Sequence, residues 1–180
     1  MWRMLMYPPR YIKETLIKDE KLVYFTRPHW IIYGPGVIAL IFAALFYTYG
    51  PAYFILRSRL LGGYPLYDLC SFFASALGAF WLLTAYVTYR TSEYGVTDKR
   101  VIMKKGWIRR NSLEIFLRRL EGVDVNQTVT GRILGYGTLV ISGMGGSRDY
   151  YTNVPQPLMF RKYVQRQVDL LIDASEEAQS

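Results

Sequence analysis

Two long stretches without a charged side chain limit what this chain can fold into more than any other feature. They cover residues 28–56, counting His29 as neutral, and residues 69–89. A bilayer core of about 30 Å is crossed by about 20 helical residues, so either stretch is long enough. A buried helix of a soluble protein would usually show a polar stripe, and neither stretch has one. The sequence therefore predicts two transmembrane helices, near residues 31–55 and 68–88.

The distribution of Lys and Arg predicts how these helices are oriented. The short connecting loop, residues 57–67, holds glycines and a proline that favour turns, so the helices should form an antiparallel hairpin. Residues 1–29 carry six Lys or Arg and residues 90–180 carry fourteen, against two in the loop. Because such residues favour the cytoplasmic side, we expect a multi-pass protein with cytoplasmic N- and C-termini. Residues 1–29 also lack the pattern of a cleavable signal peptide.

Small residues recur on the second predicted helix at spacings of four. One series holds Ser71, Ser75 and Ala79, and a second holds Ala74 and Gly78. Small residues at this spacing let helix backbones approach closely in lipid. These five residues are therefore candidates for helix packing, either within the hairpin or against a partner helix.

The pattern changes after residue 90. Residues 91–154 are rich in Val, Ile, Thr and Tyr and are broken by glycines and turn pairs, which is typical of short strands. Strands are predicted at 90–96, 100–105, 108–116, around Val123 and Val125, at 139–142 and at 150–154. A helix near 158–175 should follow, with an apolar stripe made by Phe160, Val164, Val168, Leu171 and Ile172.

Antiparallel strands followed by one amphipathic helix favour a small barrel or curled sheet with the helix over one open end. The predicted fold is thus an α+β membrane protein. It would have a cytoplasmic N-terminal segment (1–29), a two-helix transmembrane hairpin (30–89), a curled antiparallel β-sheet or barrel capped by a C-terminal α-helix (90–174) and a flexible tail (175–180).

A set of residues within 93–160 is specific as an ordered whole, although each piece alone is weak. Its members are Thr97, Asp98, Arg100, Gly106, Glu114, Ile115, Leu117, Val123, Val125, Gln127, Arg132, Leu134, Gly135, Tyr136, Gly137, Thr138, Val154, Pro155 and Pro157. With this set the chain resembles the membrane-flanked bacterial pleckstrin-homology (PH) family of the YdbS-like type, and the entry to the first helix, residues 27–30, resembles it more weakly. Phe116 and Gly122 depart from the family pattern, which usually has Pro and a polar residue there. The resemblance implies a seven-stranded curled sheet with a C-terminal helix and no enzymatic activity. With the charge bias, it places the chain in the bacterial inner (plasma) membrane.

The residues themselves also argue against catalysis. The glycines at 143–146 lack the Lys and the following helix of a phosphate-binding loop. The single cysteine, Cys70, falls in a predicted span, where it cannot pair with His29 as a nucleophile and base. One cysteine also excludes a Cys-based zinc cluster. We therefore expect no enzyme activity and no cofactor or metal. The net charge of +8 is spread along the chain without a nucleic-acid-binding motif, so nucleic acid is not an expected partner.

The stretch TDKRVIMKKGWIRR, residues 97–110, follows the second span and holds six Lys or Arg against one Asp. A strand that leaves the membrane near residue 90 and returns after a turn at 97–100 would bring the next turn back near lipid. Each basic residue near an anionic leaflet contributes about 1 kcal/mol. The candidates for a lipid-surface or partner-binding site are Lys104, Lys105, Trp107, Arg109 and Arg110. The alternative is a solvated strand edge whose lysines deter edge pairing.

Together these features predict a non-enzymatic, membrane-anchored binding or scaffold module. Its partners would be membrane lipids and either a membrane protein complex, as an accessory or assembly component, or a second copy of the chain. Sheet edges and small-residue helix faces offer places for such contacts. Two alternatives stay open: an anionic-lipid headgroup binding module at the inner leaflet, and a subunit of an oligomeric transporter or channel. The second is disfavoured because the predicted helices hold no charge inside the membrane.

Overall fold

The chain folds into two compact units, one inserted into the other in sequence. The computed structural model describes residues 10–52, 59–60, 64–106, 111–144 and 146–177. Residues 30–90 form a helical unit, and the described parts of 1–29 and 91–180 together form a second unit, here called the domain.

Two apolar helices make up most of the helical unit. A 3-10 turn, η2 (Trp30–Tyr33), leads into α2 (Gly34–Tyr49), which continues into η3 (Gly50–Ala52). The longer α4 spans Leu66–Thr91, and two short paired strands, β2 (Arg59–Leu60) and β3 (Tyr64–Pro65), precede it. A proline stands in the first turn of α2, where its missing N–H costs no helical hydrogen bond. Both apolar stretches, Trp30–Ala52 and Leu66–Thr91, are long enough to cross a membrane, and only 11% of each apolar window is buried.

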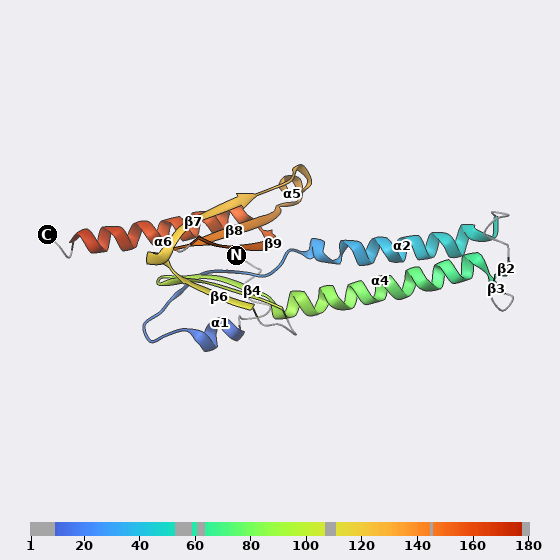
Figure 1. Ribbon diagram of the computed structural model, residues 1–180, viewed down its shortest axis with the longest axis horizontal. Helices are drawn as coiled ribbons and strands as arrows, with labels where there is room; N and C mark the ends of the chain where they lie inside the picture. The colour runs from blue at the N-terminus through green and yellow to red at the C-terminus, as the bar shows by residue number, and fades with distance from the viewer. Residues whose placement is uncertain (1–9, 53–58, 61–63, 107–110, 145, 178–180) are drawn as a thin grey trace. The chain divides into compact units, whose positions relative to one another are not determined.

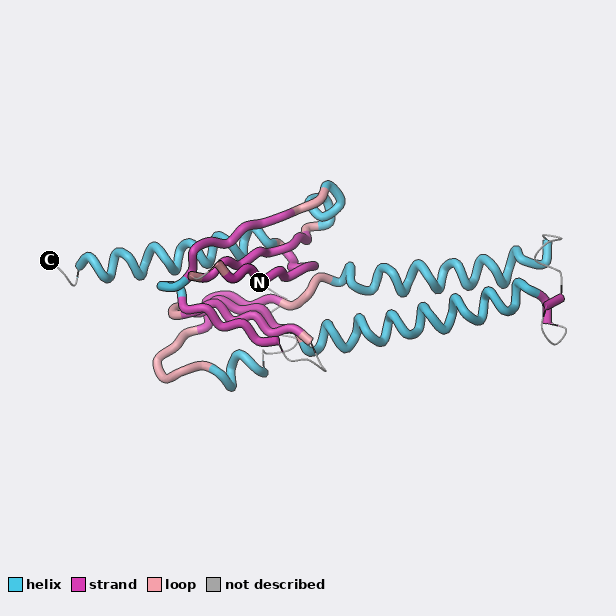
Figure 2. The backbone as a smooth tube through the Cα atoms, in the orientation of Figure 1, coloured by secondary structure: helices cyan, strands magenta, loops and turns pink. Residues whose placement is uncertain are grey.

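Two antiparallel sheets build the domain (Figures 1 and 2). The first has the order β1-β4-β5-β6 and the second the order β7-β8-β9. The bounds in the first sheet are β1 Leu22–Thr26, β4 Glu93–Thr97, β5 Arg100–Lys105 and β6 Asn111–Phe116. The bounds in the second are β7 Leu120–Asn126, β8 Tyr136–Gly143 and β9 Ser147–Pro155. Three short helical elements, α1 (Arg10–Thr15), η4 (Leu117–Arg119) and α5 (Val129–Leu134), accompany them.

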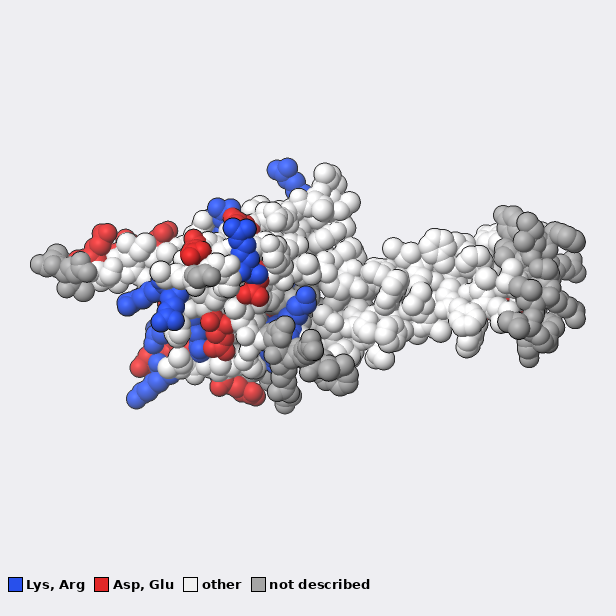
Figure 3. Space-filling view, viewed as in Figure 1, with Lys and Arg blue, Asp and Glu red and all other residues white. Residues whose placement is uncertain are grey.

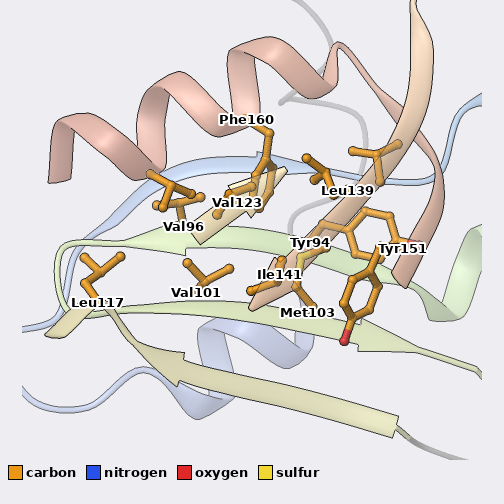
Figure 4. Packing of buried hydrophobic residues seen from close by; sticks show 12 residues of the cluster. Tyr94, Val96, Val101, Met103, Leu117, Val123, Leu139, Ile141, Tyr151 and Phe160 are labelled. Carbon is orange, nitrogen blue, oxygen red and sulfur yellow. The ribbon is translucent and has the colours of Figure 1, made fainter. Parts of the chain in front are cut away.

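The hydrophobic core lies between the sheets and under the last helix, α6 (Pro157–Glu177). Phe160 points from α6 toward side chains of both sheets, and Tyr94 and Tyr151 meet edge to face with ring centroids 5.7 Å apart (Figure 4). Each large apolar side chain buried in this way contributes about 1.5–3 kcal/mol. The core therefore ties strands of both sheets and α6 into one cooperative unit.

The predicted α+β fold with antiparallel strands and a C-terminal helix is confirmed. The described part of the domain has seven strands, the number that the resemblance implied, but they form two sheets of four and three strands and not one curled sheet. One of these strands, β1, lies within residues 1–29, which were predicted to be an N-terminal segment separate from the sheet domain. It pairs with β4, so residues 22–26 are part of the sheet. Periodicity is a local signal and could not show a pairing between residues about 70 positions apart.

Further details differ from the sequence prediction. The C-terminal helix continues to Glu177, into the residues predicted as a flexible tail (175–180). The strand expected from residue 90 begins at Glu93, because α4 continues to Thr91. The short helix α5 was not predicted. In α6, Phe160 and Val164 are buried and Val168 and Leu171 pack on the core, but Ile172 is 50% exposed. Adjacent side chains of a helix point about 100° apart, so Ile172 faces away from the core when Leu171 packs on it.

Candidate functional site

The strand register gives the domain two distinct ends. Thr26 of β1 lies opposite Tyr94 of β4, so the chain leaves for the helical unit at the same end of the sheet at which it returns. Lys104 lies opposite Glu93, so β5 finishes at this end too. We call it the tethered end. The opposite end, where residues 97–100 turn between β4 and β5, is called the distal end.

The short helix α5 also belongs to the tethered end. His29, the last residue before the helical unit, donates its backbone N–H to the carbonyl oxygen of Asn153 at 2.6 Å. The imidazole ring of His29 lies 5.4 Å from the ring of Tyr136, centroid to centroid. Because Tyr136 begins β8 directly after Gly135 closes α5, these contacts place α5 beside the point where the chain leaves the domain.

Local hydrogen bonds hold α5 in a defined conformation. The hydroxyl of Thr128 accepts the backbone N–H of Gly131 at 3.1 Å, which caps the start of the helix. Gly135 ends it in the left-handed region with φ +77°, a conformation that glycine adopts without a steric cost. The side-chain amide of Gln127 donates to the carbonyl oxygen of Tyr136 at 3.0 Å, and Gln156 N–H donates to the carbonyl oxygen of Gly135 at 2.8 Å.

Despite this internal order, α5 presents apolar side chains to the outside. Val129 is 77% exposed, Ile133 78% and Leu134 43%. Arg132 is exposed between them, and residues 126–137 contain no acidic side chain. The tip of the β7–β8 connection, labelled α5 in Figure 1, is thus an apolar surface with one cation. The helix was not predictable from the sequence, because six residues are too short for a clear helical period.

Two of the basic residues predicted as a binding site, Lys104 and Lys105, are described, and both lie at the tethered end. Lys104 is half-buried, and its ammonium lies 4.2 Å from the ring centroid of Tyr11, a cation–π contact. Lys105 is exposed. Trp107, Arg109 and Arg110 lie outside the described residues. Lys105 therefore presents an exposed cation, whereas the ammonium of Lys104 contacts Tyr11 of α1.

A buried carboxylate explains why α1 lies against this region. Glu93 is 4% exposed, and its Oε2 accepts the backbone N–H groups of Tyr11 at 3.1 Å and Ile12 at 3.2 Å. These donors belong to the first turn of α1, which has no intrahelical partners for them. The negative charge also suits the positive end of the helix dipole. Glu93 thus attaches residues 10–15 to β4.

A second buried network occupies the distal end. The guanidinium of Arg100 donates to both carboxylate oxygens of Glu20 at 2.9 Å each, to Glu114 Oε2 at 2.6 Å and to the carbonyl oxygen of Thr15 at 2.6 Å. Arg100 is 5% exposed and Glu20 7%. Two parallel N–H···O bonds to one carboxylate are the strongest arrangement that an arginine makes. This network joins residues 15–20 to the sheet.

The turn residues of the TDKR sequence complete that network. The Thr97 hydroxyl donates to Glu20 Oε1 at 2.7 Å and accepts the backbone N–H of Arg100 at 3.0 Å. Asp98 accepts the N–H of Lys21 at 2.9 Å. Burial acts to raise the pKa of the Glu20 carboxyl, but hydrogen bonds from Arg100, from Ile17 N–H and from Thr97 outweigh it, so the pKa lies below its usual value. Thr97, Asp98 and Arg100 belong to the set of residues that carries the family resemblance, and their role here is to hold the fold together.

In the helical unit, some of the predicted small residues face the other helix. The Ser71 hydroxyl donates to the carbonyl oxygen of Ala43 at 3.1 Å. Gly78 is buried, and a Cβ there would lie 2.9 Å from a methyl carbon of Leu40. Ala74 and Ser75 are half-buried, and Ala79 is exposed. Close packing of α2 and α4 through Ser71 and Gly78 accounts for the small residues at those two positions.

Comparison with known families agrees with this architecture. Residues 31–168 match a family model described as the bacterial PH domain, which is more than half of the chain. The chain belongs to the bacterial PH-domain family. No curated protein and no solved structure gives a significant match to it. The match to the bacterial PH domain does not resolve the YdbS-like type, which remains a prediction.

The range of the match is informative in itself. It begins at the first apolar helix, takes in α4 and both sheets, and ends within α6. The apolar hairpin is therefore part of what the bacterial PH-domain family model recognises. Among the described residues there is no group of three or more His, Cys, Asp or Glu side chains placed to hold a metal ion. The exposed features of the PH domain include α5, Lys105 and the edge strands of the sheets.

Proposed function

We propose that this bacterial PH-domain protein is a non-enzymatic binding module, anchored by its helical hairpin in the bacterial inner membrane with both termini in the cytoplasm. The observation that carries the proposal is the place of the hairpin in the fold. It is inserted between β1 and β4, two hydrogen-bonded neighbours, so both connections leave from one end of one sheet. An anchor at this position holds the PH domain by two linkages instead of one.

The surface of the hairpin supports the membrane assignment. Its exposed side chains include Ile38, Phe42, Phe72, Phe80 and Leu83. In the view of Figure 3, charged side chains gather on the domain, and the described surface of α2 and α4 is almost free of them. Monomeric soluble proteins rarely expose a continuous apolar surface larger than a few hundred Å². In lipid, the exposure of these apolar side chains to water, which is unfavourable, would not occur.

The binding role rests on the open edges of the sheets. In the four-stranded sheet β6 is an edge strand, hydrogen-bonded to β5 on one side. An extended segment of a partner can add to such an edge through main-chain hydrogen bonds. We propose that the module serves as an accessory or assembly component of a membrane protein complex in this way.

A second candidate, binding of anionic lipid headgroups at the inner leaflet, is favoured by one observation. Lys105 is exposed at the tethered end, where β5 stops. Its neighbour Lys104 pairs with Glu93, two residues after α4 ends, so Lys105 is a candidate for contact with an anionic leaflet, whose surface potential has a range of about 8 Å at physiological salt.

Membrane anchoring can be tested by alkaline extraction and sided labelling. The full chain should remain in the membrane pellet at high pH. A cysteine placed at Met144, which is 68% exposed at the β8–β9 turn, should react with a membrane-impermeant maleimide in inside-out vesicles and not in right-side-out vesicles. Cys70 is replaced by Ala in both samples. Release of the chain into the supernatant, or labelling from the outside, would contradict the proposal.

The two binding roles separate in a purification from native membranes in mild detergent. A partner recovered at a fixed ratio, and lost when β6 is blocked by Ser112→Pro, supports the assembly role. Recovery of the protein alone with enriched anionic lipid supports the headgroup role. Replacing Lys104, Lys105, Arg109 and Arg110 by Gln should then abolish the lipid enrichment and leave recovery of a protein partner intact.

A further inference from the structure

We propose that α5 is a membrane contact of its own, which inserts its apolar side chains among the lipid headgroups of the cytoplasmic leaflet. This rests on the proposed membrane anchoring and adds a second, peripheral attachment to it. Val129, Ile133 and Leu134 would enter the interface, and Arg132 would meet lipid phosphates. No binding pocket is required.

The first argument is the exposure of these side chains in an ordered segment. The cap at Thr128, the left-handed Gly135 and the bonds from Gln127 and Gln156 hold the backbone of α5 in place. The same contacts leave two β-branched side chains, Val129 and Ile133, more than three-quarters exposed. Exposed apolar side chains are unfavourable in water, so an ordered segment that turns them outward is expected to have an apolar partner.

The second argument is the covalent connection to the hairpin. His29 bonds to Asn153 and stacks near Tyr136, and the next residue in the chain, Trp30, begins the first apolar stretch. If that stretch enters the membrane, His29 lies at the interface, and the residues it contacts lie close to the interface as well. α5 ends at Leu134, and only its capping residue, Gly135, separates it from Tyr136.

Charge and size favour lipid over a protein as the occupant. Residues 126–137 carry Arg132 as their single charged residue, which suits an anionic leaflet. A stable protein interface buries about 800 Å² on each partner, and a helix of six residues cannot supply that area. An interfacial contact needs no minimum area, because its apolar residues enter only about 5–10 Å into the headgroup region.

Spin-label accessibility in the intact chain tests whether α5 enters the headgroup region. Single cysteines replace Ile133, Met144 or Leu77 in a Cys70→Ala chain, and each carries a nitroxide. Met144 is the matched control, since it is 68% exposed and apolar but lies at the opposite end of β8. Leu77 lies on the exposed surface of α4 and reports on the hairpin. The proteins are reconstituted in vesicles of phosphatidylethanolamine and phosphatidylglycerol, and power saturation is measured with oxygen and with a water-soluble nickel chelate.

The expected result is a label at 133 that collides with oxygen and is shielded from nickel, at a depth of about 5–10 Å. The label at 144 should be open to nickel, and the label at 77 should lie deep in lipid. A Val129→Cys chain repeats the measurement at a second position of α5, in case the label at 133 disturbs the helix.

Three results would overturn the inference, and they separate it from the proposed function. Labels at 129 and 133 open to nickel, with the label at 77 in lipid, would leave the anchor standing and remove the α5 contact. A label at 133 shielded from both reagents and immobilised would mean that protein, not lipid, covers α5. A label at 77 open to nickel would refute the membrane anchoring itself and the α5 contact with it.

Discussion

The two ends of the PH domain use basic and apolar residues in opposite ways. At the distal end, Arg100 is almost fully buried and donates to two carboxylates and a carbonyl oxygen. At the tethered end, Lys105 and Arg132 are exposed, and α5 turns valine and isoleucine outward. The distal end also has exposed basic residues, such as Lys99, but apolar side chains turned outward from an ordered helix lie beside the exposed cations at the tethered end.

This difference shows why a basic stretch cannot be interpreted by composition alone. Burying an ion pair costs desolvation, which hydrogen bonds to Glu20 and Glu114 offset at the distal end. Four of the five N–H donors of this guanidinium are used in these hydrogen bonds, and the side chain is buried, so it is poorly placed to bind a phosphate. The buried Arg100 network therefore has a structural role, and the proposed binding surface is the one at the tethered end.

The largest effect should come from breaking the distal network. Arg100→Met leaves Glu20 buried without its bidentate partner, so we expect a loss of about 3–5 kcal/mol in the free energy of unfolding of the domain. Hydrogen–deuterium exchange of β4 and β5 peptides in the detergent-solubilised full chain measures it. Lys99→Met, one residue away at an exposed position, should change the same quantity by less than about 0.5 kcal/mol. Equal protection in the two variants would show that the network carries no stability.

At the tethered end, Gly131→Ala should distort α5. A Cβ at Gly131 would lie 2.7 Å from the carbonyl oxygen of Tyr136, a backbone atom that cannot move aside. Forcing such a contact costs about 1–3 kcal/mol. Faster exchange is expected in residues 126–137. Gly122→Ala is the matched control, because no atom lies within 4 Å of its added Cβ. Indistinguishable exchange in the two variants would contradict the close approach at Gly131.

The distal end should also respond to acid. The pKa of Glu20 is lower in the folded protein than in the unfolded chain, where a glutamate titrates near 4.3. Its contribution to stability is therefore complete above about pH 4.3 and is lost as the pH falls through the lower folded pKa. Thermal unfolding between about pH 6 and pH 3 should show a fall in the melting temperature that is shallower in Glu20→Gln. The same slope in both proteins would assign the acid sensitivity to other groups.

The smallest effect concerns Lys105. If the tethered end faces an anionic leaflet, Lys105→Glu removes a cation worth about 1 kcal/mol, or about fivefold in affinity for anionic lipid. Lipid mass spectrometry of the purified protein should show less phosphatidylglycerol. Lys99→Glu makes the same change at the distal end and should leave the lipid content unchanged. An equal loss in both variants would indicate a non-specific charge effect.

Much of the architecture was predictable because its signals are local. The two apolar helices follow from runs without charge, and their bounds differ from the predicted ones by a few residues. Phe160 and Val164 of α6 were found through their spacing. The small residues Ser71 and Gly78 were also recognised as packing positions, and they face α2.

Local sequence signals could not predict which basic residues of the candidate site are exposed. Lys104 belongs to the basic stretch by sequence, but Tyr11, more than ninety residues earlier, covers its ammonium. Arg100 has the same charge as Lys105 but is paired with Glu20, eighty residues away. Such pairings depend on chain closure over long distances, which neither periodicity nor local propensity encodes.

The sequence by itself therefore determined the division of this chain into an apolar hairpin, an antiparallel sheet region and an amphipathic helix, because charge and alternation act residue by residue. Only the tertiary structure decided that β1 completes the four-stranded sheet, that Arg100 is buried, and that α5 lies beside the exit to the hairpin. Each of these features depends on hydrogen bonds or packing between segments that are far apart in the sequence, and such contacts form only when the chain has folded.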